Sequence, residues 1–312
     1  MSAFLLRRLW QMVPTLFGVI LLVFVLFNFV GGDPAYLLAG KISNPAQIES
    51  IRNQLGLNES YAVQLGIFIK QVVTADFGSS WSTNEPVSQI IATRIGPSLV
   101  VLIPILVIET VLAILIAVLV AYVRSSLTDR AIMVACTVAM SVSLLVYIIV
   151  GQYVLAYQFG WFPVQGWGES LRENLLKYAA LPVLLGVAVG IAPNVRLYRT
   201  FILDEVNQDY VRTARAKGLD ENTVMLKHVL RNALIPIITN LMAYLPALLI
   251  GHFLIERFFS IPGIGREVIM AVERSDFPVI KAITIYVAIA TMVINLLTDL
   301  LYKAVDPRVK LQ

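Results

Sequence analysis

Charge, cysteine and histidine are scarce in this chain. Charged residues make up 14% of its 312 residues, and there are two histidines and one cysteine. A single cysteine cannot form an intrachain disulfide or a cysteine cluster for a metal, so we expect Cys136, inside an apolar stretch, to be a buried structural thiol. The phosphate-binding pattern GxxxxGK(S/T), the zinc pattern HExxH and the nucleophile elbow GxSxG are also missing. We therefore expect neither an enzymatic active site nor a metal or cofactor bound by this chain.

Hydrophobic residues, in contrast, make up 58% of the chain. Several runs exceed the ~18 consecutive apolar residues that mark a membrane span, and a helix satisfies its own backbone hydrogen bonds inside a bilayer. The sequence therefore predicts an all-α membrane protein with six transmembrane helices. We expect these helices at Leu9–Val30, Leu99–Val123, Ala131–Tyr157, Ala179–Phe201, Ala233–Ile255 and Ala282–Tyr302.

The distribution of Lys and Arg predicts the orientation of these spans. If the N-terminus is cytoplasmic, 14 basic residues lie on the cytoplasmic side and 6 lie in the short loops on the other side. Because basic residues of short loops favour the cytoplasm, both termini are expected there. The first apolar run is too long for a signal peptide and no small-x-small cleavage site follows at once, which indicates an uncleaved span.

Two segments on the predicted outer side have features of their own. Residues 31–97 contain the amphipathic stretches QIESIRNQLGL and YAVQLGIFIKQVV, and we expect them to form short helices in an extracytoplasmic apron. Residues 258–282 combine a Pro-Gly turn, a helix-compatible stretch and a further proline. No internal repeat or low-complexity linker divides the sequence, so 1–312 is expected to be one membrane domain.

Prolines interrupt the fourth and fifth expected spans or their ends. A proline removes a backbone donor, so kinks are expected at these positions. Helices broken in this way can line a translocation path, but they also occur in purely structural bundles, and the sequence leaves both interpretations open. The prolines are Pro182, Pro193, Pro236 and Pro246.

The segment YVRTARAKGLDENTVMLKHVLRNALIP, residues 210–236, carries the clearest functional signal. Asp209 is expected to cap a short helix over Tyr210–Lys217, which Gly218 ends in the left-handed conformation that glycine adopts without strain. Asp220 is expected to cap the next helix. This arrangement predicts a short helix, separate from the spans, in the cytoplasmic loop between the fourth and fifth of them.

The side chains of this short helix suit contact with another protein. Ala214 and Ala216 would let a partner's surface come close to the backbone, while Arg215 and Lys217 suit the C-terminal end of the helix dipole. The pattern predicts a coupling helix within the loop 202–232. The alternative is an ordinary loop that is basic because it is cytoplasmic, and spacing alone leaves both open.

Three ionisable side chains are expected within or near the ends of the spans: Glu109, Asp299 and His252. A charge at mid-membrane costs roughly 2.5 kcal/mol or more, so Glu109 should face the interior of the bundle. It is either a substrate-path residue, for example opposite a cationic amino group, or one half of a structural hydrogen bond between helices. Asp299 and His252 lie nearer the span ends. Asp299 is expected to be solvated or paired, and His252 to be a satisfied or interfacial histidine.

Nine blocks follow one another along the chain: FNFVGGDPAYLLAG, RNQLGL, TADFGSS, PVSQIIATRIGPSL, FGWFPVQG, YVRTARAKGL, HVLRNALIP, FSIPGIGREVIMAVERSDFPV and NLLTDLLYKAVDPRV. Together they resemble the inner-membrane permease subunits of the dipeptide, oligopeptide and nickel branch of ATP-binding-cassette (ABC) importers. One block alone is weakly specific. This many in the same order cover the chain nearly end to end.

The sequence departs from that family's pattern at several places. Gly31 stands where the family usually has the proline of Pro-Gly-Asp-Pro, and Arg212, Thr213 and Ala214 replace the Glu-Ala-Ala of the general importer motif, as in the peptide branch. The third span, SVSLLVYIIVGQYV, lacks an early proline and tryptophan, and the outer loop 164–178 is short. The last two changes lie near the expected path, so they bear on the substrate more than on the mechanism.

The resemblance implies a permease subunit at a bacterial inner membrane that passes short peptides by alternating access. It implies three kinds of partner: a second permease subunit, usually a related chain, two ATPase subunits that carry ATP and Mg²⁺, and an extracytoplasmic substrate-binding protein. Nickel or another small solute is the alternative cargo within the family. Outside the family, the alternatives are a stand-alone gradient-driven carrier and a non-transporting scaffold or receptor.

The resemblance also assigns contact residues. Those expected to meet the ATPase are Tyr210, Arg212, Thr213, Ala214, Arg215, Ala216, Lys217 and Gly218. Those expected near the docked binding protein are Asp33, Pro34, Pro262, Gly263 and Gly265.

Overall fold

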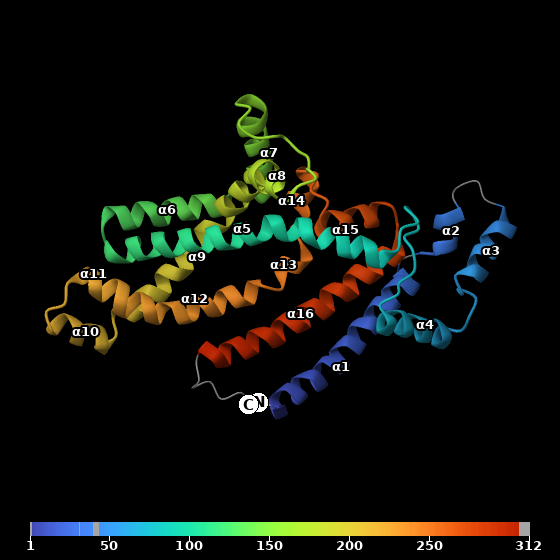
Figure 1. The fold of residues 1–312 in the computed structure, drawn as a ribbon, viewed down its shortest axis with the longest axis horizontal. Coiled ribbons are helices and arrows are strands. Elements are labelled where there is room, and N and C mark those ends of the chain that lie inside the picture. The colour runs from blue at the N-terminus through green and yellow to red at the C-terminus, as the bar shows by residue number, and fades with distance from the viewer. Residues whose placement is uncertain (1, 31, 40–43, 306–312) are drawn as a thin grey trace. The chain divides into compact units, whose positions relative to one another are not determined.

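The structure of the protein is a computed structural model that describes residues 2–30, 32–39 and 44–305 (Figure 1). In this part of the chain every regular element is helical, apart from one isolated bridge between Ser79 and Pro86. The chain forms two compact units. Unit 1 contains Met1–Pro97, Leu249–Phe253 and Pro262–Gln312, and unit 2 contains Ser98–Leu248 and Leu254–Ile261.

Unit 1 is built around two long apolar helices, α1 and α16, that pack along each other. Its core joins these helices to α4 through Ile20, Phe24, Phe68, Val72 and Ile285, all buried. The elements of unit 1 are α1 (Ser2–Val25), the π-helix η1 (Leu26–Val30), α2 (Pro34–Ala39), α3 (Pro45–Gln54), α4 (Tyr61–Thr74), the start of α5 (Val87–Tyr122), α15 (Ile264–Glu273) and α16 (Phe277–Val305).

The short helices expected in the apron are present as α2, α3 and α4. Asn44 and Gln47 form a capping box at the start of α3, in which each side chain accepts a backbone hydrogen bond from the other end of the turn. α4 ends at Ala75, which adopts the left-handed conformation with φ of 53°. Gly31, the departure from the family pattern, lies outside the described residues, as do the last residues of the C-terminal block.

Unit 2 is built around α9, which packs against α6, α7 and α12. Its largest core cluster includes the fully buried residues Tyr198 and Ile202 of α9, together with small residues of α5 such as Ala113 and Ala117. The elements of unit 2 are the rest of α5, α6 (Leu127–Ser141), α7 (Leu144–Gly151), η2 (Gln152–Gln158), α8 (Leu171–Glu173), η3 (Asn174–Tyr178), α9 (Ala180–Val206), α10 (Asp209–Ala216), α11 (Glu221–Thr223), η4 (Val224–Val229), α12 (Leu230–Tyr244), the start of α13 (Ala247–Ile250) and most of α14 (Phe253–Phe258).

Four described helices are long and apolar enough to cross a membrane, and a bent pair raises the number of candidate spans to five. The four are Leu6–Phe29, Val87–Tyr122, Ala180–Val206 and Phe277–Leu300, which correspond to the first, second, fourth and sixth expected spans. The protein is therefore a multi-pass helical membrane protein. The count of six spans stays a prediction.

The third expected span, Ala131–Tyr157, is not one straight helix. Its two halves, Leu127–Ser141 and Leu144–Gln158, meet at an angle of 89°. Ser143 caps the second half by accepting a hydrogen bond from the backbone N–H of Val146 at 3.4 Å. The side chain of a serine can satisfy the free donors of a new helix end, and this favours a break where the apolar pattern alone predicts continuity.

The fifth expected span, Ala233–Ile255, is also interrupted. α12 ends at Tyr244, two residues before Pro246. Leu245 keeps helical dihedral angles, but Pro246 has no backbone N–H to continue the hydrogen bonds of the helix. A second break follows at Gly251, which has a φ of 80°. Pro193 and Pro236, by contrast, lie inside α9 and α12, which continue through them.

Candidate functional site

The short helix expected in the loop 202–232 is present as α10, with one correction at its start. The N-cap is Gln208, whose side chain makes no capping bond, and Asp209 is the first helical residue rather than the cap. Gln208 is extended, with φ of −72° and ψ of 152°, so the chain turns into the helix one residue earlier than expected. Asp209 still favours the helix, because a carboxylate in the first turn suits the positive end of the dipole.

The left-handed turn after α10 is as predicted, although the helix ends at Ala216, one residue earlier than expected. Gly218 has a φ of 77°, in the left-handed region that glycine enters without strain. The N–H of Gly218 donates to the carbonyl of Arg215 at 2.9 Å, and the N–H of Leu219 donates to that of Ala214 at 3.4 Å. This pair of bonds is a Schellman motif, which satisfies two carbonyls at the helix end. Asp220 then caps α11 by accepting from the N–H of Thr223 at 3.1 Å, also as predicted.

One side of α10 packs against its own chain. Val211 is fully buried and Ala214 is 5% exposed, and both belong to the cluster that contains Val224 and Met225 of η4. Ala214 therefore serves the packing of α10 onto η4 and offers no surface to a partner, contrary to the expectation from its small size.

Polar contacts fix the ends of α10. The guanidinium of Arg215 donates to the Glu221 carboxylate from Nε at 3.0 Å and from Nη2 at 2.6 Å. The Tyr210 hydroxyl donates to the carboxylate of Glu205, the last turn of α9. Partial burial, together with the Glu205 carboxylate, raises the pKa of Tyr210 to about 12. The Arg215 guanidinium lowers the pKa of Glu221 below its usual range.

The opposite side of α10 is open. The exposed residues on it are Asp209, Tyr210, Arg212, Thr213, Ala216 and Lys217, followed by Gly218. It therefore presents two cations, a hydroxyl and an aromatic edge around one small residue, together with the Asp209 carboxylate, which pairs with Arg212 at 3.4 Å. Such a surface can receive an acidic or polar groove of another protein.

A two-point ion pair, which the sequence reasoning missed, connects the helix before α10 with α6. Arg199 of α9 donates to the Asp129 carboxylate from Nε at 2.9 Å and from Nη2 at 2.8 Å, and the N–H of Ser125 also donates to it at 2.9 Å. Asp129 is 4% exposed. The available signal was an acid in the first turn of one helix and an arginine inside an apolar stretch of another, but their pairing depends on the tertiary fold.

Glu109 has a partner on another helix of unit 2. The amide of Asn194, on α9, donates to the Glu109 carboxylate. Gly190, one turn earlier on α9, provides the space, because a Cβ there would collide with that carboxylate. Of the two roles that the sequence left open, this geometry matches the structural hydrogen bond between helices. The bond between Asn194 and Glu109 forms without a substrate.

The remaining ionisable candidates lie elsewhere. Asp299 of α16 forms an ion pair of 2.9 Å with Arg8 of α1, so it is paired, as expected. His252 lies at the break between α13 and α14, half-buried. Cys136 is buried in α6, as predicted. Among the described residues, no cluster of three or more His, Cys, Asp or Glu side chains has the arrangement of a metal site.

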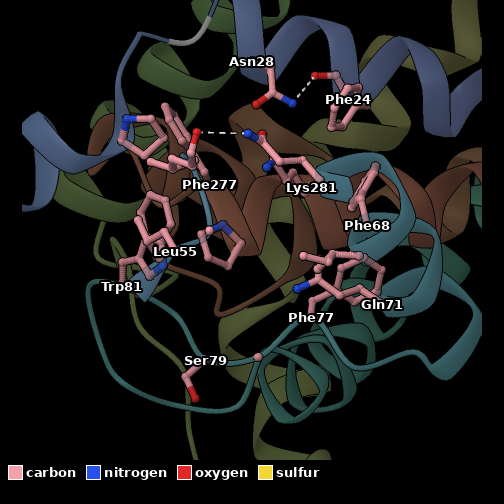
Figure 2. A pocket seen from close by; sticks show the side chains of 17 residues that line it. Phe24, Asn28, Leu55, Phe68, Gln71, Phe77, Ser79, Trp81, Phe277 and Lys281 are labelled. Carbon is pink, nitrogen blue, oxygen red and sulfur yellow. Dashed lines mark hydrogen bonds between the residues drawn. The ribbon is translucent and has the colours of Figure 1, made fainter. Parts of the chain in front are cut away.

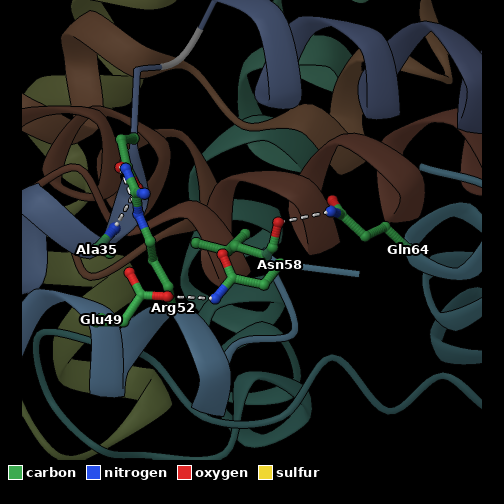
Figure 3. A network of polar contacts seen from close by, with 7 residues as sticks. Ala35, Glu49, Arg52, Asn58 and Gln64 are labelled. Carbon is green, nitrogen blue, oxygen red and sulfur yellow. Dashed lines mark hydrogen bonds and ion pairs between the residues drawn. The ribbon is translucent and has the colours of Figure 1, made fainter. Parts of the chain in front are cut away.

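The residues expected near a docked binding protein hold the outer segments in shape. Asp33 pairs with Arg52 and accepts a bond from the N–H of Ala35 at 3.0 Å, so it fastens the start of α2 to α3 (Figure 3). Pro34 is the first residue of α2.

The other expected docking residues lie in the second outer segment. Gly263 is the N-cap of α15 and Gly265 is in its first turn, and both are buried. Pro262, before them, is half-buried. The two glycines therefore shape this segment and do not form its outer surface.

Comparison with known proteins gives the family. Residues 110–311 match the family described as binding-protein-dependent transport system inner membrane component, and residues 1–103 match the N-terminal part of binding-protein-dependent transport system membrane components. The chain is 33% identical over 333 residues to the dipeptide transport system permease protein DppB of Alkalihalophilus pseudofirmus, covering 99% of this chain and 100% of the relative.

Two further relatives agree with this family. The chain is 34% identical to a putative peptide transport system permease protein of Brucella abortus and 34% identical to the glutathione transport system permease protein GsiC of Shigella boydii. Each alignment covers 99% of both chains. The chain therefore belongs to the inner-membrane components of binding-protein-dependent transport systems, in the dipeptide and oligopeptide branch of the ABC importer permeases.

Proposed function

We propose that this chain forms part of the membrane passage for short peptides and takes its energy from separate ATPase subunits. The relatives named for dipeptide, peptide and glutathione transport match it over 99% of its length, so the likeness includes the spans, the outer segments and α10. A glutathione permease among them supports a cargo of two or three residues.

The observation that carries this proposal is the arrangement of α10. This helix has eight residues. Val211 and Ala214 pack one side of it against the chain's own core, and Arg215 bonds its C-terminal end to Glu221. The other side is exposed to partners. The sequence has no phosphate-binding loop of its own. In the proposed complex, a partner ATPase binds ATP and Mg²⁺ and contacts α10. Movement of the ATPase then displaces α10 together with α9 and α6.

The Asp129–Arg199 pair supports the transmission of that movement. α9 leads directly into α10, and the two-point contact ties α9 to α6 at the end near the loop. A displacement of α10 would therefore shift two membrane helices together instead of bending the loop alone. The coupling residues are Tyr210, Arg212, Thr213, Ala216 and Lys217 at the contact, with Ala214, Arg215 and Gly218 setting the helix position.

The rest of the assembly follows from the same proposal. Two permease chains, this one and a related partner, enclose the passage; two ATPase subunits dock on the cytoplasmic side, where both termini of the six-span chain lie. A substrate-binding protein docks on the outer segments, whose shape is set by Asp33, Pro34, Pro262, Gly263 and Gly265. Glu109 is the candidate in this chain for contact with a cationic group of the cargo.

Uptake of a labelled dipeptide tests the proposal. Cells that lack this chain should take up the peptide several-fold more slowly than cells that carry it. Uptake through the chain should stop when ATP is depleted but continue when an uncoupler collapses the proton gradient at a constant ATP level. Loss with the uncoupler alone would identify a gradient-driven carrier, and uptake of Ni²⁺ but not peptide would identify the alternative cargo.

A further inference from the structure

Unit 1 contains a pocket of about 280 Å³ that none of the proposed coupling or passage residues lines, although Pro34 of the proposed docking segment does (Figure 2). Its walls come from the end of α1 and η1, from Pro34, from the turn after α3, from α4, from the loop before α5 and from the start of α16. Aromatic rings form much of the lining, and five polar side chains are set among them. The rings are Phe24, Phe68, Phe77, Trp81 and Phe277, and the polar residues are Asn28, Gln64, Gln71, Ser79 and Lys281.

Lys281 is the cation of this pocket. Its Nζ lies 5.3 Å from the ring centroid of Phe27 and 5.6 Å from that of Phe68. In the part of the chain that the structure describes, no carboxylate lies within ion-pairing distance of it. Ring faces compensate only part of the cost of removing an ammonium group from water, so the site favours an anion from outside the chain.

The wall beside Lys281 is held rigidly. The buried carboxylate of Asp276 accepts hydrogen bonds from the N–H groups of Trp81 and Ser82 at 3.1 and 3.2 Å and from the hydroxyls of Ser80 and Ser82. These bonds place the Trp81 ring 5.6 Å from that of Phe277. Because the Asp276 carboxylate already accepts these hydrogen bonds from the loop, it does not act as the counter-ion of Lys281.

The side-chain amides of Asn28 and Gln71 can form hydrogen bonds with a polar ligand. Asn28 donates from Nδ2 to the carbonyl of Phe24 at 3.0 Å, which leaves its Oδ1 to accept a bond from a hydroxyl. The amide of Gln71 makes no hydrogen bond with the described residues. Gln64, in contrast, uses its Nε2 on the carbonyls of Leu57 and Glu59. The lining thus offers the Lys281 cation, the Asn28 oxygen as an acceptor and the complete Gln71 amide inside aromatic walls, and the exposed Ser79 adds a hydroxyl.

We propose that this pocket binds the anionic head group of a membrane phospholipid, with its phosphate at Lys281 and its hydroxyls at Asn28 and Gln71. A lipid is favoured over a free oxyanion because α1 and α16, which both contribute residues to the pocket wall, are candidate spans. Apolar surface also continues from the pocket: Ile67 at its edge is 46% exposed, and Leu21, one turn from Phe24, is 43% exposed. Acyl chains can lie along these residues.

Binding of dihexanoyl phosphatidylglycerol to the purified permease, with the subunits that co-purify, tests this site. The zwitterionic dihexanoyl phosphatidylcholine is the reference lipid, and the signal is the part of the tryptophan fluorescence change that Trp81→Phe abolishes. We expect phosphatidylglycerol to bind at least tenfold more tightly. Lys281→Met should reduce that preference to less than twofold, and Lys281→Arg should keep it. Lys70→Met is the matched control, because Lys70 is an exposed lysine on α4.

Equal affinity of the wild-type protein for the two lipids would overturn the proposal, and this result does not depend on any variant folding. The same preference in Lys281→Met as in the wild type would also overturn it. If inorganic phosphate displaces phosphatidylglycerol at an equal concentration, the occupant is a free oxyanion and the assignment to a lipid is wrong.

Discussion

The guanidinium of Arg215 and the carboxylate of Glu221 close the turn between α10 and α11 with two hydrogen bonds of 3.0 and 2.6 Å. This contact fixes the end of α10 before any partner is bound. A preformed helix loses less conformational freedom when it docks than a flexible loop does, so the pair favours tight coupling. The two side chains are 34% and 42% exposed, and the free energy of their interaction should accordingly be small, at most about 1 kcal/mol.

The Arg215–Glu221 pair should make the order of this turn dependent on pH. Because the pKa of Glu221 is lowered in the folded protein, its stabilising contribution is present above the ordinary glutamate pKa and is lost as the pH falls through the lowered value. Amide hydrogen exchange of residues 209–223, corrected for the intrinsic effect of pH, should become faster at the acidic end. Asp220 contributes to the same dependence, because its bonds from Thr223 lower its pKa too. Glu221→Gln should therefore remove the part that comes from the pair with Arg215, and an unchanged profile in that variant would show that Glu221 does not contribute.

Gly218 should be required for coupling through its backbone conformation. A Cβ at this position would meet no atom within 4 Å, so a substitution acts by strain in the left-handed conformation and not by collision. Gly218→Val should cost about 1–2 kcal/mol locally and reduce peptide uptake while the protein still accumulates in the membrane. Gly218→Asn is the matched control, because asparagine tolerates this conformation, and it should retain most of the uptake. Equal uptake by the Val variant and the wild type would exclude the role.

Glu109→Gln separates the two roles of this residue. A glutamine can still accept the bond from Asn194, so a purely structural contact predicts little change in uptake. A contact with the amino group of the cargo predicts a larger loss for peptides with a free amino terminus than for blocked analogues. Uptake normalised to membrane protein level distinguishes these outcomes, and an equal loss for both peptides would reject the amino-group contact.

The orientation of the chain can be measured with introduced cysteines. Ser60→Cys in the apron and Asn222→Cys beside α10 are both at exposed positions, and Asn222 avoids the capping role of Asp220. In a Cys136→Ala background, a membrane-impermeant thiol reagent should label position 60 in intact spheroplasts and position 222 only after lysis. Labelling of both positions from the same side would show that the six-span arrangement is wrong.

Local patterns predicted the turn between α10 and α11 well, although they placed the N-cap of α10 at Asp209 instead of Gln208. Gly218 and Asp220 form the expected turn because left-handed geometry and side-chain capping are properties of the immediate sequence. The bend at Ser143 and the break at Gly251 were missed because apolar composition continues through both. Hydropathy records where a chain is apolar, but it does not record where the helix axis changes direction.

The partners of charged residues could not be predicted from the sequence. The sequence showed that a charge at Glu109 would be unfavourable at mid-membrane, but it did not show what contacts this side chain. Asn194 and Gly190 lie more than 80 positions away, and only the packing of α5 on α9 brings them to Glu109. The same holds for Asp129 and Arg199. Ala214 shows the converse: its size suggested a docking surface, but the helix is oriented so that this residue faces η4.

Affinity purification of the tagged chain from membranes in mild detergent, followed by identification of the bound chains, tests the central claim most directly. The wild-type chain should co-purify with a second permease chain and with ATP-binding subunits. A variant with Arg212, Thr213 and Lys217 changed to Ala should keep the second permease but lose most of the ATP-binding subunits, because only the open side of α10 is altered. The absence of any ATP-binding subunit from the wild-type sample, or its equal recovery with the variant, would contradict the account.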